Sequence, residues 1–164
     1  MNLDKLKEPY VIILIGPPLS GKTTWINKNF EPESFELISR DQIVLDLHGE
    51  NDYNTAFKSV DQKEVDRILV NKLSTTAKER KNAIVDMTHM NSKRRKYNLS
   101  FFGSEYYKLA VIFPILKDEE YVVRDKKRTE EEQKSIPMYV IKNMISSYQT
   151  VDKEKEGFDK VISL

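Results

Sequence analysis

A chain of 164 residues can bury one substantial hydrophobic core and is short for two, so we expect residues 1–164 to form a single domain. Hydrophobic residues make up 39% and charged residues 32%, as in soluble globular proteins, and no apolar run approaches the roughly 20 residues needed to span a membrane. The absence of cysteine excludes disulfides and thiolate metal sites, and the formal charge of +1 by itself indicates no partner.

The first predicted element is a strand over Tyr10–Ile15, a continuous apolar run typical of a strand covered on both faces. It leads into GPPLSGKT, residues 16–23, which matches GxxxxGK[ST], and a helical stretch over Thr24–Asn29 follows. In such a loop the backbone N–H groups face phosphate oxygens, Lys22 reaches the β and γ phosphates, and the Thr23 hydroxyl binds Mg²⁺. The loop predicts a nucleoside triphosphate site, and it leaves hydrolysis, switching and transfer open.

A second, shorter strand is predicted over Phe35–Ile38, and Asp41 follows it. Ligands gather at the carboxyl ends of strands in open α/β sheets, so Asp41 could accept a proton from an attacking hydroxyl. It could equally cap the next helix, for which Asp is a favoured residue. Beyond it, apolar residues from Phe57 to Ala77 recur at spacings that predict one long amphipathic helical face, namely Phe57, Val60, Val65, Ile68, Leu69, Leu73 and Ala77.

A third strand is predicted over Ala83–Val85, followed by Asp86, which could orient Mg²⁺ or its water ligands. Thr88, His89 and Asn91 could line a substrate groove or cap the next helix, and we assign His89 no catalytic role. The basic cluster Lys93–Lys96 fits either a substrate groove or a solvated helix face.

The remaining predicted strands cover Leu109–Ile115 and Phe158–Leu164, and a helix with Val140, Ile141, Met144 and Ile145 facing inward is expected after Pro137. Strands and helices thus alternate, which predicts an α/β fold with five parallel strands and helices on both faces. Arg124 and Arg128, four residues apart, would project from one helix face. They could neutralise charge that develops during phosphoryl transfer, or belong to an exposed basic helix.

In this order, the segments IGPPLSGKTTW, ISRDQI, IVDMTHMNSKRRKYN, VRDKKR and IPMYVIKNMISSY resemble the kinase domain of bacteriophage-type 5′-polynucleotide kinases. The resemblance runs from Tyr10 to about Tyr148. The phosphate loop is common to a vast superfamily. Arg-Asp after the second strand, Thr-x-x-Asn followed by paired arginines, and the Arg-x-x-x-Arg lid are more discriminating together.

The resemblance implies a P-loop kinase with a small helical lid that transfers the γ-phosphate of ATP to the 5′-hydroxyl of DNA or RNA. It implies that Asp41 is the general base, that Lys22 and Thr23 hold ATP·Mg²⁺, and that Arg128 stabilises the transferred charge with support from Arg124. Thr23 and Asp86 would serve the metal, and Arg40, Asp41, Thr88 and Asn91 the acceptor. The residues expected to bind the nucleotide are Gly16, Pro17, Pro18, Leu19, Ser20, Gly21, Lys22, Thr23, Thr24, Arg124 and Arg128.

Three features depart from the best-known phage members. Val44 stands where an arginine contacts the nucleic acid, Asp86 precedes by one residue the usual position of the strand-3 aspartate, and acidic residues lengthen the segment between Arg128 and Pro137. A kinase of a small acceptor, such as a nucleoside, sugar, antibiotic or sugar nucleotide, is therefore the alternative. A nucleotide-dependent switch or binding module is a third hypothesis. With no apparent secretory signal, we expect a cytoplasmic protein with a nucleic-acid 5′ end as its partner and no membrane association.

Overall fold

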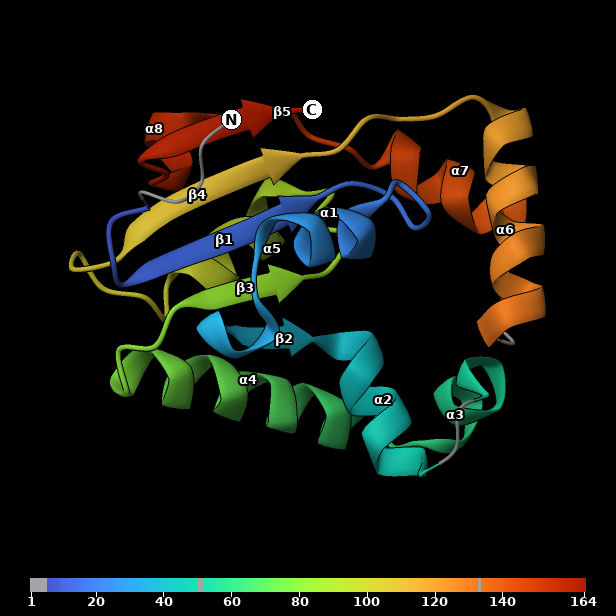
Figure 1. Ribbon diagram of the computed structural model, residues 1–164, viewed down its shortest axis with the longest axis horizontal. Coiled ribbons are helices and arrows are strands. Elements are labelled where there is room, and N and C mark those ends of the chain that lie inside the picture. Colours follow the sequence, from blue (N-terminus) through green and yellow to red (C-terminus); the bar gives the residue numbers. More distant parts are fainter. Residues whose placement is uncertain (1–5, 50–51, 133) are drawn as a thin grey trace.

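The computed structural model describes residues 6–49, 52–132 and 134–164, and its centre is one five-stranded sheet (Figure 1). All strand pairs are parallel, and the strand order is β2-β3-β1-β4-β5. Because parallel neighbours must be joined by crossover connections, helices lie between the strands along the chain. The strands are β1 (Tyr10–Ile15), β2 (Glu36–Ser39), β3 (Ala83–Asp86), β4 (Tyr107–Ile112) and β5 (Lys160–Ser163).

All five predicted strands are present, and the prediction for β1 is correct at both ends. The largest error concerns β4, which begins two residues before Leu109 and ends at Ile112, three residues before the predicted end. Pro114 has no N–H to donate to a neighbouring strand, and Ile115 is exposed, so the apolar sequence runs past the end of the strand.

The central strand β1 supplies side chains to two separate cores. Val11, Ile13 and Ile15 pack in a cluster with buried side chains of α2, α3, α4 and α5. Tyr10, Ile12 and Leu14 pack on the opposite face, where α1 contributes Ile26 and Trp25. Successive strand residues point to opposite faces, so a strand that is apolar throughout requires both faces to be covered. The predicted doubly covered α/β fold is confirmed.

The helices follow one another between the strands, and a short 3₁₀ turn over Pro32–Ser34 precedes β2. In chain order they are α1 (Lys22–Asn29), α2 (Arg40–His48), α3 (Tyr53–Ser59), α4 (Gln62–Lys78), α5 (Ser92–Leu99), α6 (Asp118–Glu132), α7 (Met138–Ser146) and α8 (Lys153–Glu156). Within the described ranges, none of these helices has the length and apolar character required to cross a membrane.

The single amphipathic face predicted from Phe57 to Ala77 is wrong, because the segment forms two helices. Asp61 caps α4 by accepting a hydrogen bond from the Lys63 N–H, and Val60 has extended backbone geometry. An Asp at this position satisfies N–H groups that a continuous helix would bond internally, so it favours a new helix start. Phe57 consequently belongs to α3 and is 45% exposed.

Helix α6 stands across the carboxyl ends of the strands, with α7 beside it and α3 near its far end (Figure 1). Of the residues of α7 predicted to face inward, Ile141 is fully buried, and Val140, Met144 and Ile145 are half-buried. Because all five strands run in the same direction, their carboxyl ends meet at this edge of the sheet, opposite α6.

Candidate active site

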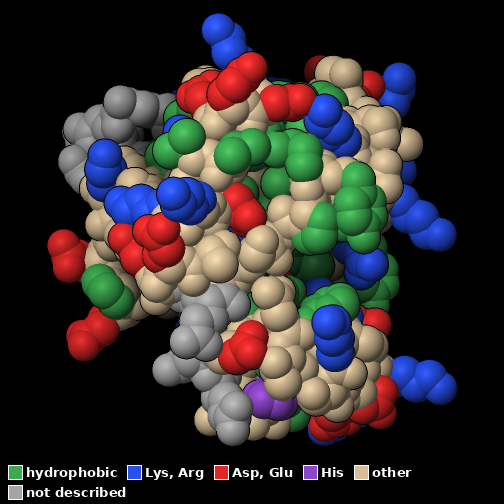
Figure 2. Space-filling view, turned by 90° about the vertical axis from the view of Figure 1, so that its right-hand side faces the viewer, with side chains coloured by type: hydrophobic (Ala, Val, Ile, Leu, Met, Phe, Trp, Pro, Cys, Tyr) green, Lys and Arg blue, Asp and Glu red, His purple; other side chains and the backbone are tan. Residues whose placement is uncertain are grey.

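A cavity of about 910 Å³ lies at the carboxyl edge of the sheet. Figure 2 looks onto this end of the molecule, where hydrophobic and basic side chains border a recess. The cavity lining includes seven described Lys and Arg residues but only three Asp and Glu residues, although the whole chain is nearly neutral. Such a local excess of positive charge favours an anionic ligand.

Most of the predicted site residues line this one cavity. They are Pro18, Leu19, Ser20, Gly21, Lys22, Thr23, Thr24, Arg40, Asp41, Asp86, Thr88, Arg124 and Arg128. Gly16 and Pro17 instead border a smaller, mainly apolar cavity of about 250 Å³ at the start of the loop. Asn91 borders neither cavity; its side chain caps α5 by accepting from the Arg94 N–H at 2.8 Å.

The phosphate loop is shaped by residues with left-handed backbone geometry between β1 and α1. Leu19 has φ 65° and Gly21 has φ 98°, and Gly21 stands immediately before the first helical residue, Lys22. A helix amino terminus leaves backbone N–H groups without intrahelical partners, and these groups favour a negatively charged ligand. The local geometry therefore fits the predicted phosphate site.

Gly16 is required at the start of the loop by steric contact. A Cβ atom on Gly16 would lie 2.8 Å from the Phe113 Cβ and 2.9 Å from the Ser20 Oγ. The Gly16 N–H donates to the Thr88 carbonyl at 3.0 Å, so the loop is fastened to the segment after β3. Any larger residue at position 16 must displace one of these neighbours.

Lys22 lies between the loop and the carboxylates. Its Nζ donates to the carbonyls of Gly16 and Pro17, at 3.1 and 2.8 Å. Burial lowers the pKa of the Lys22 ammonium, and the negative charges of Asp86 and Asp41 oppose this effect. Burial conversely raises the pKa of Asp86, with Lys22 acting in the opposite direction. Lys22, Asp86 and Asp41 thus interact electrostatically in one site.

Asp41 does not cap helix α2, because Ser39 occupies the capping position and its Oγ accepts from the Gln42 N–H. The Asp41 carboxylate instead accepts hydrogen bonds from the Tyr53 hydroxyl, at 2.7 Å, and from Lys134 Nζ. Burial alone would raise the pKa of Asp41, but the charge and hydrogen bond of Lys134, together with Tyr53, hold it below its ordinary value. Asp41 is therefore ionised at neutral pH and available to accept a proton.

The two lid arginines on α6 make different contacts. Arg124 Nη1 donates to the Leu19 carbonyl of the phosphate loop at 2.9 Å. Arg128 pairs with Asp125 and donates through Nε to the Lys134 carbonyl at 3.2 Å. Arg128 therefore contacts the backbone of the same residue whose ammonium contacts Asp41. This connection brings the lid and Asp41 together.

The segment from Lys134 to Ile136 is held by a single carboxylate of α6. Asp125 accepts from the Ser135 hydroxyl at 2.8 Å and from the Ile136 N–H at 3.0 Å. Neither Lys134 nor Tyr53 was predicted from the sequence to be a site residue. No local motif marks them, since they reach Asp41 from 93 and 12 residues away along the chain.

Among the predicted acceptor residues, Arg40 lines the cavity and also pairs with Asp66 and Gln62 of α4. Thr88 lines the same cavity. Val44, which the resemblance aligns with an arginine that contacts nucleic acid, is fully buried in the core and offers no polar group to a ligand.

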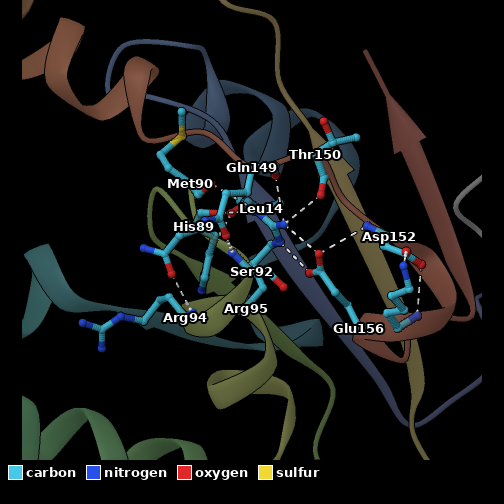
Figure 3. Close-up of polar contacts among 12 residues, drawn as sticks. Leu14, His89, Met90, Ser92, Arg94, Arg95, Gln149, Thr150, Asp152 and Glu156 are labelled. Carbon is cyan, nitrogen blue, oxygen red and sulfur yellow. Dashed lines mark hydrogen bonds and ion pairs between the residues drawn. The ribbon is translucent and has the colours of Figure 1, made fainter.

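The assignment of the Lys93–Lys96 cluster to a groove or an outer face is wrong for Arg95, which is fully buried. Figure 3 shows the polar partners of its side chain. Its guanidinium donates to both carboxylate oxygens of Glu156, at 2.6 and 2.7 Å. It also donates to backbone carbonyls of His89 and Gln149, both at 3.0 Å. Arg95 thus has a structural role, which its position in a run of basic residues concealed.

His89 also has a structural environment, at the end of the segment that follows β3. It is buried with φ 47°, and its two ring nitrogens contact the Leu14 carbonyl and the Asn98 side chain, each at 2.8 Å. Burial lowers the pKa of His89 to about 4, so it is neutral under ordinary conditions.

One sequence family and several solved structures are similar to this chain. Residues 11–151 match the sequence family described as "AAA domain". A structure of the Pnkp1/Rnl/Hen1 RNA repair complex has a TM-score of 0.69 and 22% identity, covering 97% of this chain and 49% of that one. The present chain therefore spans about half the length of that relative.

Two other similar structures extend the range of relatives. A gluconokinase from Sinorhizobium meliloti 1021 has a TM-score of 0.54 and 12% identity, covering 96% of this chain and 83% of that one. The PezAT chromosomal toxin–antitoxin system of Streptococcus pneumoniae gives a TM-score of 0.62 and 15% identity, with 96% and 67% coverage. At these identities the structural similarity establishes the fold alone.

Proposed function

We propose that this chain, which belongs to the AAA domain family and is a P-loop kinase, transfers the γ-phosphate of ATP to the 5′-hydroxyl of a polynucleotide. The observation that carries the proposal is the position of Asp41. Its ionised carboxylate lines the same basic cavity as Lys22 and Arg128, and it is held there by Tyr53 and Lys134. The similarity of the fold to a structure of the Pnkp1/Rnl/Hen1 RNA repair complex supports a nucleic-acid acceptor.

In the proposed reaction, the acceptor hydroxyl donates a hydrogen bond to Asp41, and the hydroxyl oxygen attacks the γ-phosphorus of ATP. The hydroxyl proton passes to Asp41 as the new P–O bond forms and the bond to the β-phosphate oxygen breaks, which leaves ADP. Lys22 and the loop N–H groups stabilise the negative charge on the β-phosphate. Arg128, supported by Arg124, neutralises charge on the transferred group.

The residues present also fit a magnesium ion. Mg²⁺ binds through one or two protein oxygens together with substrate phosphates and water, so a cluster of three ligating side chains is not required. Within the described ranges, His, Cys, Asp and Glu form no such cluster, but Thr23 and Asp86 both line the cavity beside Lys22. They would hold the ion, which supplies charge neutralisation to the phosphates when bound.

The experiment is transfer of radiolabelled γ-phosphate from ATP to 5′-hydroxyl DNA and RNA oligonucleotides, compared with Asp41→Asn. Loss of the base should reduce kcat by about 10²- to 10⁴-fold. Asp46→Asn is the matched control, because Asp46 lies on the same helix, is exposed and accepts a hydrogen bond from Gln42 on the helix surface. Labelling by Asp41→Asn at the wild-type rate would reject the proposed base.

A small-molecule acceptor is the second candidate, and two observations favour it. Val44 is buried and offers no contact to a nucleic acid, and a gluconokinase shares the fold. The same labelling assay with a panel of nucleosides, sugars and sugar nucleotides tests it. A small acceptor whose kcat/KM far exceeds that of every oligonucleotide would replace the polynucleotide in the proposal.

A further inference from the structure

Helix α3 places two aromatic rings beside the candidate base. Tyr53 and Phe57 are four residues apart and so share one helix face, with ring centroids 5.9 Å apart and planes inclined at 31°. Both side chains line the large cavity. The helix begins at Asp52, whose carboxylate caps it by accepting from the N–H groups of Asn54 and Thr55. The capped helix holds both rings on the cavity side.

Tyr53 is fixed by contacts on its edge and on its face. Its hydroxyl donates to Asp41, and Lys134 Nζ lies 3.8 Å from its ring centroid, which is a favourable cation–π distance. Burial, followed by the negative charge of Asp41, raises the pKa of Tyr53, so the hydroxyl remains a hydrogen-bond donor. The ring of Tyr53 therefore packs against Phe57 in a position that the contacts with Asp41 and Lys134 determine.

Phe57 is the more accessible member of the pair, with 45% of its surface exposed. A single exposed phenylalanine is ordinary on a protein surface. Here, however, the ring lines a cavity that also holds the candidate base and seven basic side chains. Aromatic rings combined with basic side chains are the means by which proteins hold single-stranded nucleic acids, through base stacking and phosphate contacts.

We propose that Phe57, supported by Tyr53, is the platform on which a nucleobase of the acceptor stacks when its 5′-hydroxyl reaches Asp41. This inference rests on the proposed polynucleotide kinase activity and specifies how that substrate is recognised. Val44 is buried in the core and offers the acceptor no polar group, so in this proposal stacking on Phe57 supplies acceptor affinity from helix α3. The site then selects an acceptor that carries a base, with little dependence on which base it is.

The first test is Phe57→Ala, assayed with a single-stranded 5′-hydroxyl oligonucleotide. Stacking that is equal in the ground state and the transition state affects KM alone, so KM should rise by roughly 5- to 150-fold while kcat is unchanged. Phe57→Trp should restore the KM, and Phe57→Leu, which keeps apolar bulk without an aromatic face, should not. ATP affinity should be unchanged in all three variants, which also verifies folding.

Tyr97→Ala is the matched control for removal of an exposed aromatic ring. Tyr97 is 47% exposed and packs edge-on against Phe101, at 5.4 Å between centroids, but it lies on α5 and does not line the cavity. Its KM should equal that of the wild type. An equal rise in KM for Phe57→Ala and Tyr97→Ala would contradict the proposal.

The second test pairs each enzyme with an oligonucleotide whose 5′-terminal or adjacent residue lacks its base. Removing the base from the acceptor should weaken its binding to the wild type by the same factor as Phe57→Ala weakens binding of the intact acceptor. Phe57→Ala should bind the abasic and the intact acceptor equally well. Independent, additive losses would overturn stacking while leaving the kinase activity intact. Failure of the wild type to label any oligonucleotide would instead reject the polynucleotide acceptor, and the stacking proposal with it.

Discussion

At the scale of single residues, Asp41 shows how neighbouring groups decide the state of a carboxylate. Burial favours its neutral form, whereas the Lys134 ammonium and the Tyr53 hydroxyl favour the ionised form and prevail. Asp86 is half-buried near Lys22, and there desolvation prevails over the attraction of the ammonium and raises the pKa of Asp86. Two carboxylates in one cavity thus have pKa values shifted in opposite directions, because positive charge and hydrogen bonds prevail at Asp41 and burial prevails at Asp86.

Replacement of Lys134 by methionine should move the acid limb of the pH profile of kcat/KM to higher pH. In the wild type the pKa of Asp41 lies below its ordinary value of 3.8, so Asp41 remains ionised as the pH falls to that range. Without Lys134, less positive charge opposes the effect of desolvation, so the pKa of Asp41 rises. Asp41 then becomes protonated, and can no longer act as the base, at a higher pH than in the wild type. The profile is measured with saturating ATP and a 5′-hydroxyl oligonucleotide.

Lys127→Met provides the control, because Lys127 lines the same cavity from α6 but pairs with Glu131. Its acid limb should coincide with that of the wild type. Coincident acid limbs for Lys134→Met and the wild type would mean that Lys134 does not govern the ionisation of Asp41.

At the scale of elements, the phosphate loop depends on two different properties of glycine. Gly21 has φ 98°, a conformation that other residues adopt only with strain, and Gly16 has no room for a Cβ atom. The same distinction separates Gly16 from Gly49, which ends α2 with φ 78°. Within the part of the chain that the structure describes, no atom lies within 4 Å of a Cβ position on Gly49. A side chain at position 16 would therefore clash within the phosphate loop, whereas a side chain at position 49 would strain only the backbone at the end of α2.

Gly16→Ala should therefore impair ATP binding far more than it impairs folding. The new methyl group must displace the Phe113 Cβ or the Ser20 side chain and disturb the hydrogen bond from Gly16 to Thr88. We expect at least a roughly tenfold rise in the Kd for ATP, the effect of about 1.4 kcal/mol. Fluorescent nucleotide binding and thermal unfolding measure the two effects separately.

Gly49→Ala serves as the comparison. It should cost about 1–2 kcal/mol of stability through its positive φ, with no change in the Kd for ATP. If both substitutions left ATP binding unchanged, close packing at Gly16 would not be what shapes the loop.

At the scale of the whole molecule, Arg95 joins segments that are far apart in the sequence (Figure 3). It connects α5 to the carbonyl of His89 before it, to Gln149 beyond α7, and to Glu156 on α8. Gln149 in turn accepts from the Ser92 N–H and donates its own N–H to the Met90 carbonyl. This network fixes the segment after β3, which holds Thr88 against the phosphate loop.

Arg95→Met should lower the free energy of unfolding by about 3–5 kcal/mol, because it leaves the buried charge of Glu156 without a partner. Combining it with Glu156→Leu should recover much of that loss, since both charges are then absent. Urea unfolding measures both values. Arg67→Met, which breaks the exposed pair with Glu64, is the control and should have little effect.

The pH dependence provides a second readout of the same pair. The pKa of Glu156 lies below its ordinary value because Arg95 and the Asp152 N–H outweigh burial. The stabilisation is therefore present above the pKa of the unfolded state and is lost as pH falls through the folded pKa. The difference in stability between Arg95→Met and the wild type should shrink in acid. A difference that is small at neutral pH would contradict the structural role.

The sequence by itself determined the fold class, the succession of strands along the chain and the phosphate loop, because these depend on local periodicity and on residues close together in sequence. Tyr10–Ile15 is a continuous apolar run typical of a doubly covered strand, and the spacing of GPPLSGKT predicts a phosphate-binding loop. The sequence also placed Asp41, Asp86, Arg124 and Arg128 at strand ends or on a lid helix. All four line the cavity.

Tertiary structure alone decided which residues surround Asp41, where the amphipathic segment breaks, and that Arg95 is buried. Lys134 and Tyr53 have no motif, and their contact with Asp41 exists only because α6 and α3 converge across the carboxyl edge of the sheet. Likewise, a basic run does not reveal which of its members faces the core. Contacts between distant segments depend on how elements pack together, and no local spacing encodes that packing.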